Sequence, residues 1–290
     1  MANVKDLNRK INSLKNMQKV MRAMNMIASI KLRKLLRFQN PLHVFSDSIE
    51  TLTQTLTGYC RDSESPIIGG FKNIKQSHII LFSADKGLCG AHNTSVKKTV
   101  DHLMAGNRDA GINTDFTCIG SKGALFCRQK GYQISMQSDI HEKIFSLNSL
   151  KQITSGIFKR FMQGEIHSVT AVYNKFLSTI SQQTTVIPLL PVPAIEEAGQ
   201  KKGGFTGYSE PEKDIFLTQA AELYLYYNLQ AALLHSRISE QAARMTAMEN
   251  ATNNSEDLIH RYGRARNRVR QATITNELIE IISGKEAMKR

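Results

Sequence analysis

LNRKINSLKNMQKVMRAMNMIASIKLRKL, residues 7–35, contains an apolar repeat from which much of the fold can be predicted. Seven of its apolar residues fall on two positions of a seven-residue repeat, four and three residues apart, as in a coiled coil. Polar Gln18 and Asn25 fill two gaps in this seam. We predict a long helix over residues 1–57, which Pro41 is expected to kink or interrupt because proline lacks an N–H donor. The apolar members are Leu7, Ile11, Leu14, Met21, Ala28, Leu32 and Leu35.

A second repeat of the same kind lies near the C-terminus, where no proline follows Pro211. It predicts another long coiled-coil helix, over residues 210–286. Polar side chains in such a seam lower its stability and set its register. The apolar members are Leu234, Ile238, Met245, Met248, Ile259, Tyr262 and Val269. The polar gaps are Gln241, Thr252, Ser255, Arg266, Thr273 and Asn276.

The middle of the chain alternates short apolar runs with helix-like stretches. This alternation predicts an α/β domain over residues 75–195 with a largely parallel sheet. A Gly-rich polar segment, residues 198–211, is expected to be a loop before the last helix. The expected strands are His78–Ser83, Asp115–Ile119, Gln133–Met136, Ser168–Tyr173 and Thr184–Leu190. The expected helices include Thr94–Met104, Lys122–Lys130 and Lys143–Phe161.

Charge and cysteine content narrow the class of protein. The net charge of +13 predicts an acidic or polyanionic partner. Residues 1–37 hold ten Lys or Arg and one acid, and residues 261–270 hold five Arg and no acid. Such surfaces suit nucleic acid, a protein partner or solvent, and the scarcity of nearby aromatic residues favours a protein. Four cysteines without a CxxC pair indicate reduced thiols, and no apolar run reaches the ~18 residues of a membrane span.

One segment, SADKGLCGAHN at residues 83–93, invites a chemical interpretation. It follows an apolar run and contains Gly87 and Gly90, which are more typical of a tight turn than of a phosphate loop. Cys89 beside His92 would suit a nucleophile and base, but nothing marks a substrate pocket, so a structural thiol is favoured. GSKG at residues 120–123 is also interpreted as a turn, with Lys122 able to contact an anion. We predict no catalytic residue, no cofactor and no metal site.

Three stretches together resemble the gamma subunit of F-type ATP synthase, and nearly the whole chain takes part in the expected order. The first is KINSLKNMQKVMRAMNMIASIKLRK, residues 10–34. The second is the 83–93 segment followed by GSKG. The third is SEQAARMTAMENATNNSEDLI, residues 239–259, with ARNRVRQATITNELIEIISG, residues 265–284. An unextended N-terminus and the lack of the cysteine insertion of plastid members point to the bacterial type.

The resemblance implies an antiparallel coiled coil of the two terminal helices with a central Rossmann-like α/β domain. It implies a rotor shaft inside a ring of three α and three β subunits, with the central domain against the epsilon subunit and the c-ring. The shaft would couple proton flow through the c-ring to ATP synthesis on the β subunits, without binding nucleotide. It would lie on the cytoplasmic face of the bacterial inner membrane and touch the membrane only through the c-ring. The alternative is a nucleic-acid-binding coiled-coil protein.

The resemblance also implies contact residues, carried over position by position. Ile279, Ile281 and Ile282 would enter an apolar bearing formed by the ring. The family usually has Arg where this chain has Lys86, and lysine lacks the planar fork of arginine. Residues expected to contact the β subunits are Lys19, Arg22, Met24, Lys86, Cys89, Arg244, Arg270, Gln271, Thr275 and Glu277.

Overall fold

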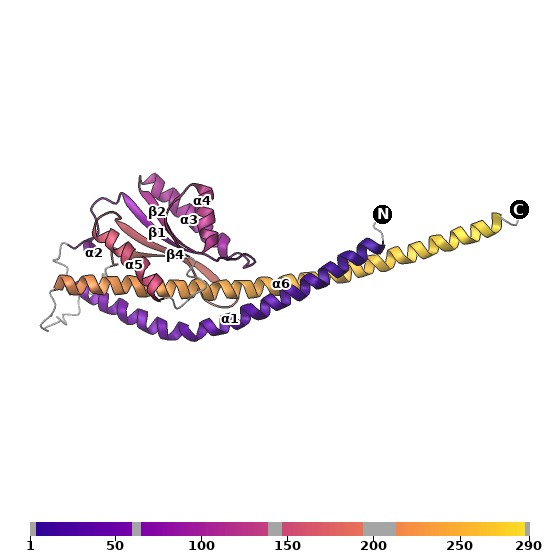
Figure 1. Cartoon of the computed structure of the whole chain (residues 1–290), viewed down its shortest axis with the longest axis horizontal. Coiled ribbons are helices and arrows are strands. Elements are labelled where there is room, and N and C mark those ends of the chain that lie inside the picture. The colour runs from indigo at the N-terminus through magenta and orange to yellow at the C-terminus, as the bar shows by residue number, and fades with distance from the viewer. Residues whose placement is uncertain (1–3, 60–64, 139–146, 194–212, 288–290) are drawn as a thin grey trace. The chain divides into compact units, whose positions relative to one another are not determined.

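A computed structural model describes residues 4–59, 65–138, 147–193 and 213–287. The chain begins and ends with a long helix, α1 and α6, and the strands and shorter helices lie between them in sequence (Figure 1). The predicted loop 198–211 and the first residues of the predicted helix 143–161 lie outside the described residues. The helices are α1 (Val4–Tyr59), α2 (Pro66–Gly69), α3 (His92–Asp109), α4 (Ser121–Lys130), α5 (Leu147–Met162) and α6 (Lys213–Ala287). The strands are β1 (Gln76–Phe82), β2 (Asn113–Ile119), β3 (Gln133–Ser138), β4 (Ser168–Phe176) and β5 (Gln182–Leu190).

The chain forms two compact units. Unit 1 combines residues 1–28 with residues 245–290, and unit 2 comprises residues 29–244. Both long helices contribute to both units. The long terminal helices and the central α/β domain confirm the predicted fold class.

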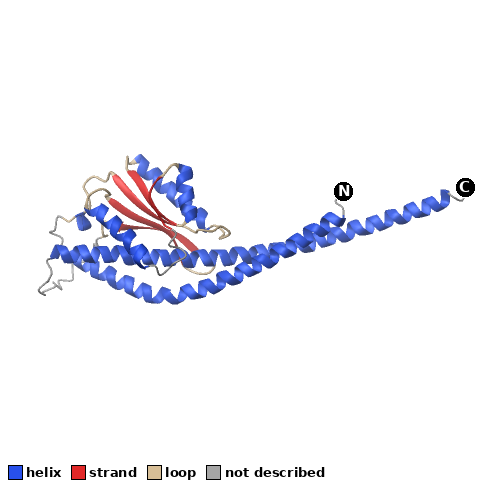
Figure 2. Cartoon of the chain, viewed as in Figure 1, coloured by secondary structure: helices blue, strands red, loops and turns tan. Residues whose placement is uncertain are grey.

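The strands of unit 2 form one sheet (Figure 2), and their order in it is β3-β2-β1-β4-β5. β1 pairs in parallel with both β2 and β4, and β2 pairs in parallel with β3. β5 returns antiparallel to β4. The carboxyl ends of the parallel strands therefore meet at one edge of the sheet, which also carries the loop after β1.

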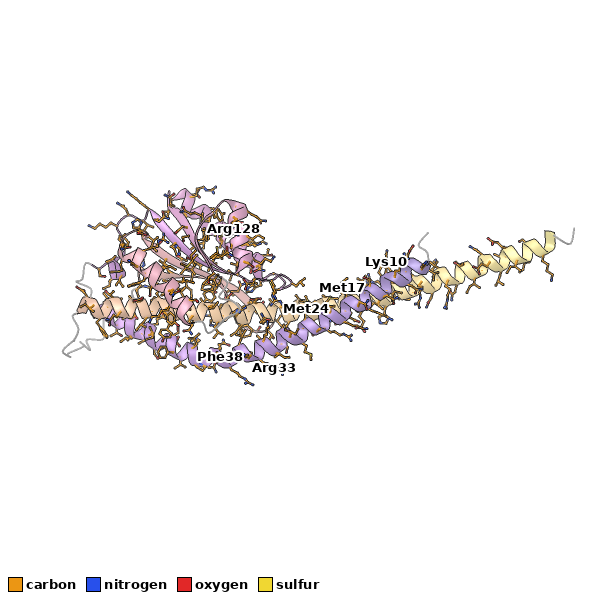
Figure 3. The ribbon with its side chains drawn as sticks, in the orientation of Figure 1. Lys10, Met17, Met24, Arg33, Phe38 and Arg128 are labelled. Atoms are coloured by element: carbon orange, nitrogen blue, oxygen red, sulfur yellow. The ribbon has the colours of Figure 1, made fainter. Side chains whose placement is uncertain are left out.

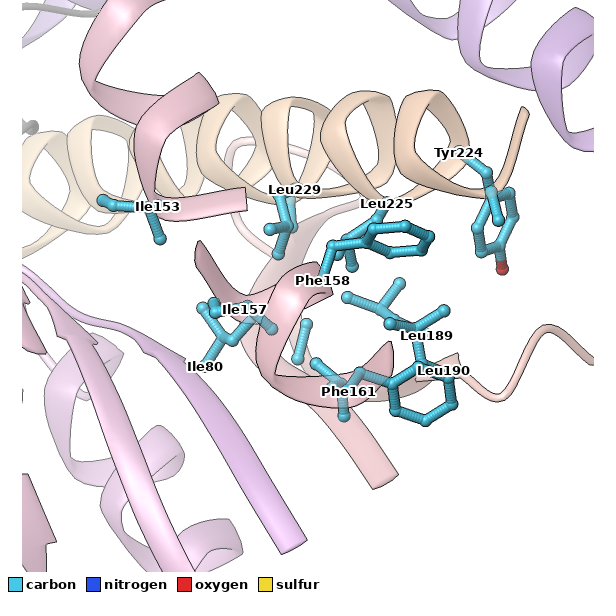
Figure 4. Close-up of a cluster of buried hydrophobic side chains, with 14 of the residues drawn as sticks. Ile80, Ile153, Ile157, Phe158, Phe161, Leu189, Leu190, Tyr224, Leu225 and Leu229 are labelled. Atoms are coloured by element: carbon cyan, nitrogen blue, oxygen red, sulfur yellow. The ribbon is translucent and has the colours of Figure 1, made fainter. Parts of the chain in front are cut away.

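Both faces of the sheet are covered by helices, which explains why the central strand β1 contains a continuous apolar run, IILF at residues 79–82, whose side chains are all buried. α5 and the first part of α6 cover one face, where Ile80 of β1, Phe158 of α5 and Leu225 of α6 share a core (Figure 4). α3 and α4 cover the other face, where Val96 and Phe126 pack against the sheet. The first half of α6 is thus fixed to the domain by burial rather than by a coiled-coil seam alone.

The expectation that Pro41 could interrupt the first helix is wrong. α1 runs without interruption from Val4 to Tyr59 with Pro41 inside it. Proline removes one helical hydrogen bond and leaves the carbonyl of the preceding turn without its partner. Pro41 is exposed, so water can satisfy that carbonyl and the helix continues.

Unit 1 is an antiparallel helix pair. Asn25 Nδ2 donates to the Met245 carbonyl at 3.4 Å. Arg266 Nη1, further along α6, donates to Asn8 Oδ1, which lies nearer the start of α1, also at 3.4 Å. Between them, the Lys10 ammonium lies 5.6 Å from the centre of the Tyr262 ring. Figure 3 marks Lys10, Met17 and Met24 along this part of α1. The seam residues of α1 are buried or half-buried, Gln18 and Asn25 among them, which confirms the predicted repeat.

A buried polar network links β1, β2 and α5. His78 contacts Asp115 from Nδ1 at 2.8 Å and Thr117 from Nε2 at 2.9 Å, and Arg160 donates to Asp115 at 2.9 Å. Burial alone would raise the pKa of Asp115, but His78 and Arg160 outweigh it and hold that pKa below its usual range. Because His78 and Asp115 are almost fully buried, we assign the network a structural role.

Because of His235, the free energy of unfolding of unit 2 is expected to fall as the pH drops from about 6.5 to about 4. Burial, with Lys175 and His43 nearby, lowers the pKa of His235 to about 4, against about 6.5 in an unfolded chain. In this window the unfolded state binds more protons, so acid favours unfolding. His235 shares a cavity of about 150 Å³ with His43, Asp47, Glu50 and Lys175. Urea unfolding of H235Q should show a weaker pH dependence, whereas H260Q, at an exposed site, should match the parent.

Candidate functional site

The β1–α3 loop, residues 83–91, is held from two sides by backbone hydrogen bonds. Ser83 N–H donates to the Ile119 carbonyl at 2.9 Å, and Lys122 N–H donates to the Ala84 carbonyl at 3.1 Å. The Ala84 N–H donates to Asn93 Oδ1 at 3.0 Å. These bonds join the loop to the end of β2, the first turn of α4 and the first turn of α3. The loop is therefore held in a defined conformation at the edge of the sheet.

The first turn of α4 approaches the loop so closely that it needs glycine. A Cβ on Gly120 would lie 2.1 Å from the Ser83 carbonyl oxygen, and Gly120 has a φ of +105°. A Cβ on Gly123 would lie 2.7 Å from Ser83 Oγ, which accepts the Gly123 N–H at the same distance. Ser121 adds a backbone hydrogen bond to Asp85 Oδ1 at 2.9 Å. The GSKG segment was predicted as a turn, but only Gly120 precedes the helix, and Ser121–Gly123 form the first turn of α4, which holds the neighbouring loop.

The apex of the loop presents a charge and an apolar side chain to solvent. Lys86 is exposed, and Leu88 is 64% exposed. Leu88 also has a φ of +62°, a conformation that costs a non-glycine residue about 1–2 kcal/mol. An exposed leucine held in a strained conformation on an anchored loop marks a candidate contact surface.

The thiol of Cys89 points inward instead. It is 2% exposed, and its sulfur accepts a hydrogen bond from Asn93 Nδ2 at 3.3 Å. Burial raises the pKa of the Cys89 thiol, with Arg244 opposing and Glu240 adding to the effect. His92 Nδ1 is engaged by Asn174 at 2.9 Å. A protonated, buried thiol is a poor nucleophile, which supports the structural interpretation of Cys89.

α6 supports the same loop through Arg244. Its guanidinium forms an ion pair with Glu240 at 2.8 Å, and both side chains are at least nine-tenths buried. Arg244 Nη2 also donates to the Gly87 carbonyl at 3.5 Å. Arg237 lies 3.8 Å from the other oxygen of Glu240. The loop and α6, more than 150 residues apart in sequence, are thus joined by a buried charge.

Unit 1 carries a separate candidate surface at the end of α6. Residues 270–285 are all exposed, because this part of α6 extends past the start of α1 (Figure 1). Large aliphatic side chains are concentrated here, and Ile281 is 67% exposed. Arg270, Gln271, Thr275 and Glu277 share the segment. The exposed aliphatic residues are Ile274, Leu278, Ile279, Ile281 and Ile282.

Comparison with known proteins identifies the family. A family model described as ATP synthase matches residues 3–288. The ATP synthase gamma chain of Glaesserella parasuis serovar 5 (strain SH0165) is 33% identical over 289 residues, which cover 99% of this chain and 100% of the relative. The gamma chain of Haemophilus influenzae (strain PittGG) is 32% identical over 290 residues, with 99% and 100% covered. The chain belongs to the ATP synthase gamma chain family.

A solved structure supports the fold of this gamma chain family member. A chain of the Euglena gracilis mitochondrial ATP synthase, from a structure of OSCP, F1 and the c-ring in rotational state 3, aligns with a TM-score of 0.65 and 16% identity. The alignment covers 98% of this chain and 94% of that one. The nucleic-acid-binding alternative is not supported by these matches. Within the described residues, no helix is long and apolar enough to span a membrane, and no cluster of three metal-ligating side chains occurs.

The contact residues carried over from the gamma family fall into three places. Lys86, Cys89 and Arg244 come together in unit 2, although only Lys86 is exposed. Lys19, Arg22 and Met24 lie on α1 in unit 1, where Arg22 is 3.9 Å from Glu256. The remaining seven lie on the exposed end of α6. They are Arg270, Gln271, Thr275, Glu277, Ile279, Ile281 and Ile282.

Some residues that build these surfaces were not predicted. Glu240 was missed, although its spacing of four from Arg244 is a helical ion-pair signal. Ile274 and Leu278 extend the aliphatic end of α6 and share the helical spacing of its other members. Asn174 could not be predicted, because its role depends on contacts with three separate elements. Its side chain forms hydrogen bonds with His92 of α3 and Thr184 of β5, and its backbone carbonyl accepts the Ser239 hydroxyl of α6.

Proposed function

We propose that this gamma subunit is the central rotor shaft of an F-type ATP synthase and couples proton flow through the c-ring to ATP synthesis on the β subunits. The observation that carries the proposal is the antiparallel helix pair of unit 1 in a chain that matches gamma chains over its full length. A long helix pair can pass through a ring of subunits, and a separate folded domain can dock on further partners. Those partners would be three α and three β subunits, epsilon and the c-ring.

The mechanism follows from unequal contact. A shaft shifts the equilibrium between β conformations only if it contacts them with different free energies. Moving a two-state population from 1:99 to 99:1 takes about 5.5 kcal/mol of differential free energy. Lys86, on a loop anchored to α3 and α4 and braced by Arg244 of α6, can offer a charge at a fixed position. Such a charge would meet an acidic segment of a β subunit at one angle of rotation and not at others.

The end of α6 would supply two further contacts. Its exposed isoleucines suit an apolar bearing, in which a smooth aliphatic surface turns without forming fixed polar bonds. Arg270, Gln271 and Thr275 are exposed and offer hydrogen-bonding groups to a β-subunit loop. Lys19, Arg22 and Met24 would meet the β subunits along α1.

The subunit itself would perform no chemistry. A buried Cys89 thiol with a raised pKa, in a tight turn rather than a phosphate loop, supports a non-catalytic role. We place the subunit on the cytoplasmic face of the bacterial inner membrane as a peripheral component that touches the membrane through the c-ring.

Assembly tests the proposal. The chain should co-purify with α and β subunits, and nucleotide hydrolysis should require the assembly. Hydrolysis by this chain alone would contradict the non-catalytic role. A salt-dependent shift of DNA or RNA, without binding to α and β subunits, would instead support the nucleic-acid-binding class.

Reversing the charge of Lys86 is expected to slow ATP hydrolysis by the assembled complex about fivefold to tenfold. At a solvated contact, two like charges about 4 Å apart repel by about 1 kcal/mol, which is about a fivefold change in rate, and about 1.4 kcal/mol would be tenfold. The measurement is steady-state hydrolysis by complexes that contain K86E. K98E makes the same change of net charge on an exposed position of α3 and should leave the rate unchanged. Equal rates for K86E and K98E would remove Lys86 from the contact.

A further inference from the structure

Two thiols face one another in the core between the sheet and α4. Cys118 of β2 donates a weak hydrogen bond to the sulfur of Cys127 on α4, at a sulfur–sulfur distance of 3.8 Å. Both side chains are fully buried, among the apolar residues that α3 and α4 pack against the sheet. No step of the proposed rotor function uses them. Two cysteines from different elements in direct contact form a dithiol, which has chemistry that a single buried thiol lacks.

We propose that Cys118 and Cys127 form a reversible redox site, in which hydrogen peroxide converts the two thiols into an intramolecular disulfide. The Cys127 sulfur attacks one peroxide oxygen, the O–O bond breaks, and a sulfenic acid and one water are formed. The Cys118 sulfur then attacks the Cys127 sulfur, the S–S bond forms, and the oxygen leaves as a second water. The thiols together lose two protons and two electrons, and the peroxide is reduced to two waters.

The hydrogen bond gives the two cysteines different roles. The bond from Cys118 lowers the pKa of the Cys127 thiol, against the opposing effects of burial and Asp101. The same bond raises the pKa of the Cys118 thiol, and burial raises it further. Cys127 is therefore the thiol that reacts first with an oxidant, and Cys118 is the thiol that resolves the sulfenic acid.

Access to Cys127 requires only a local opening. Cys127 lies in the last turn of α4, and its carbonyl accepts the Tyr132 N–H at 2.9 Å just beyond the helix end. Helix ends open at a lower free energy than sheet cores, so peroxide can reach Cys127 without global unfolding. A disulfide holds its sulfurs at about 2.05 Å, so these two must approach by about 1.7 Å. Side-chain rotation and a shift of α4 towards β2 would supply this movement.

A shift of α4 would reach the β1–α3 loop. The first turn of α4 holds that loop through the Lys122 N–H on Ala84 and the Ser121 N–H on Asp85. Oxidation in the last turn of this ten-residue helix would therefore change how the loop presents Lys86. This step rests on the proposed function of the loop, whereas disulfide formation does not.

The chemistry is tested on the full chain carrying C60S and C89S, which keeps only Cys118 and Cys127. After peroxide treatment, neither thiol should titrate and the mass of each chain should fall by two hydrogen atoms. Peptide mapping should find the Cys118 and Cys127 peptides linked by a disulfide. Dithiothreitol should restore both thiols. With C118S added, a dimedone adduct should form on Cys127, whereas with C127S added Cys118 should stay reduced. Persistence of both thiols, or linkage between chains, would overturn the proposal.

The effect on the loop is tested in the assembled complex. Oxidation of the C60S/C89S chain should change the hydrolysis rate, and reduction should reverse the change. A matched chain carrying C118A and C127A in addition should respond to neither treatment. Complete disulfide formation with an unchanged rate would contradict the link to the loop, while the rotor function would be judged separately by co-purification and hydrolysis of the complex that contains the unsubstituted chain.

Discussion

Replacing Arg244 by methionine is expected to lower the free energy of unfolding of unit 2 by about 3 kcal/mol or more, because it leaves a buried carboxylate without its main partner. Arg244 and Glu240 are both buried and lie 2.8 Å apart. Arg237, at 3.8 Å from Glu240, would recover only part of the lost interaction. The Gly87 carbonyl would lose its contact with Arg244, so the β1–α3 loop would also loosen. Equilibrium urea unfolding measures the first effect, and hydrogen exchange of residues 83–91 measures the second.

A double substitution separates two effects of R244M: the unpaired buried carboxylate of Glu240 and the lost contact with the loop. R244M with E240L removes both charges, and replacing a buried ion pair by apolar residues is often neutral or stabilising. The double variant should therefore regain most of the stability lost in R244M, although its loop should remain loose. K130M removes an exposed ion pair with Asp101 and should cost less than about 1 kcal/mol. A double variant no more stable than R244M would show that the penalty does not come from the unpaired carboxylate.

The parts of the fold that follow from local pattern could be predicted from the sequence. The seam from Leu7 to Leu35 is periodic, and β1 contains an apolar run followed by turn residues, so the types of these elements could be predicted. Pro41 was misjudged because the outcome depends on whether water reaches the freed carbonyl, and exposure is a property of the folded chain. The antiparallel return of β5 follows from its hairpin connection to β4.

The candidate site was predicted as separate residues and not as an arrangement. Lys86 and Arg244 could be named, but nothing local indicates that Arg244 reaches the Gly87 carbonyl. The inward direction of Cys89 and the outward direction of Leu88 depend on one positive φ within a loop. The contact of Cys118 with Cys127 requires β2 and α4 to pack, and their spacing of nine residues is no recognised motif. Pairings across elements are tertiary properties, and periodicity does not encode them.

Substituting Gly120 by alanine is expected to be the most damaging glycine-to-alanine change among the described residues, at about 3 kcal/mol or more, since backbone strain and overpacking each cost about 1–3 kcal/mol. The added Cβ would lie 2.1 Å from the Ser83 carbonyl oxygen, and the φ of +105° is one that alanine adopts only under strain. Relief would require the first turn of α4 to withdraw from Ser83. The hydrogen bonds that hold Ala84 and Asp85 would then break, so the β1–α3 loop should be displaced.

The same substitution at Gly156 provides a control of opposite sign. Gly156 lies inside α5, and a Cβ there would meet nothing within 4 Å. G156A should therefore raise the free energy of unfolding by about 0.5–1 kcal/mol, since alanine is the better helix former. Urea unfolding compares both variants with the parent, and ATP hydrolysis by assembled complexes shows whether the displaced loop matters for the rotor. If G120A were as stable as the parent, the close approach of α4 to Ser83 would not be what fixes the loop, and Lys86 would lose its physical support as a contact held in a defined position.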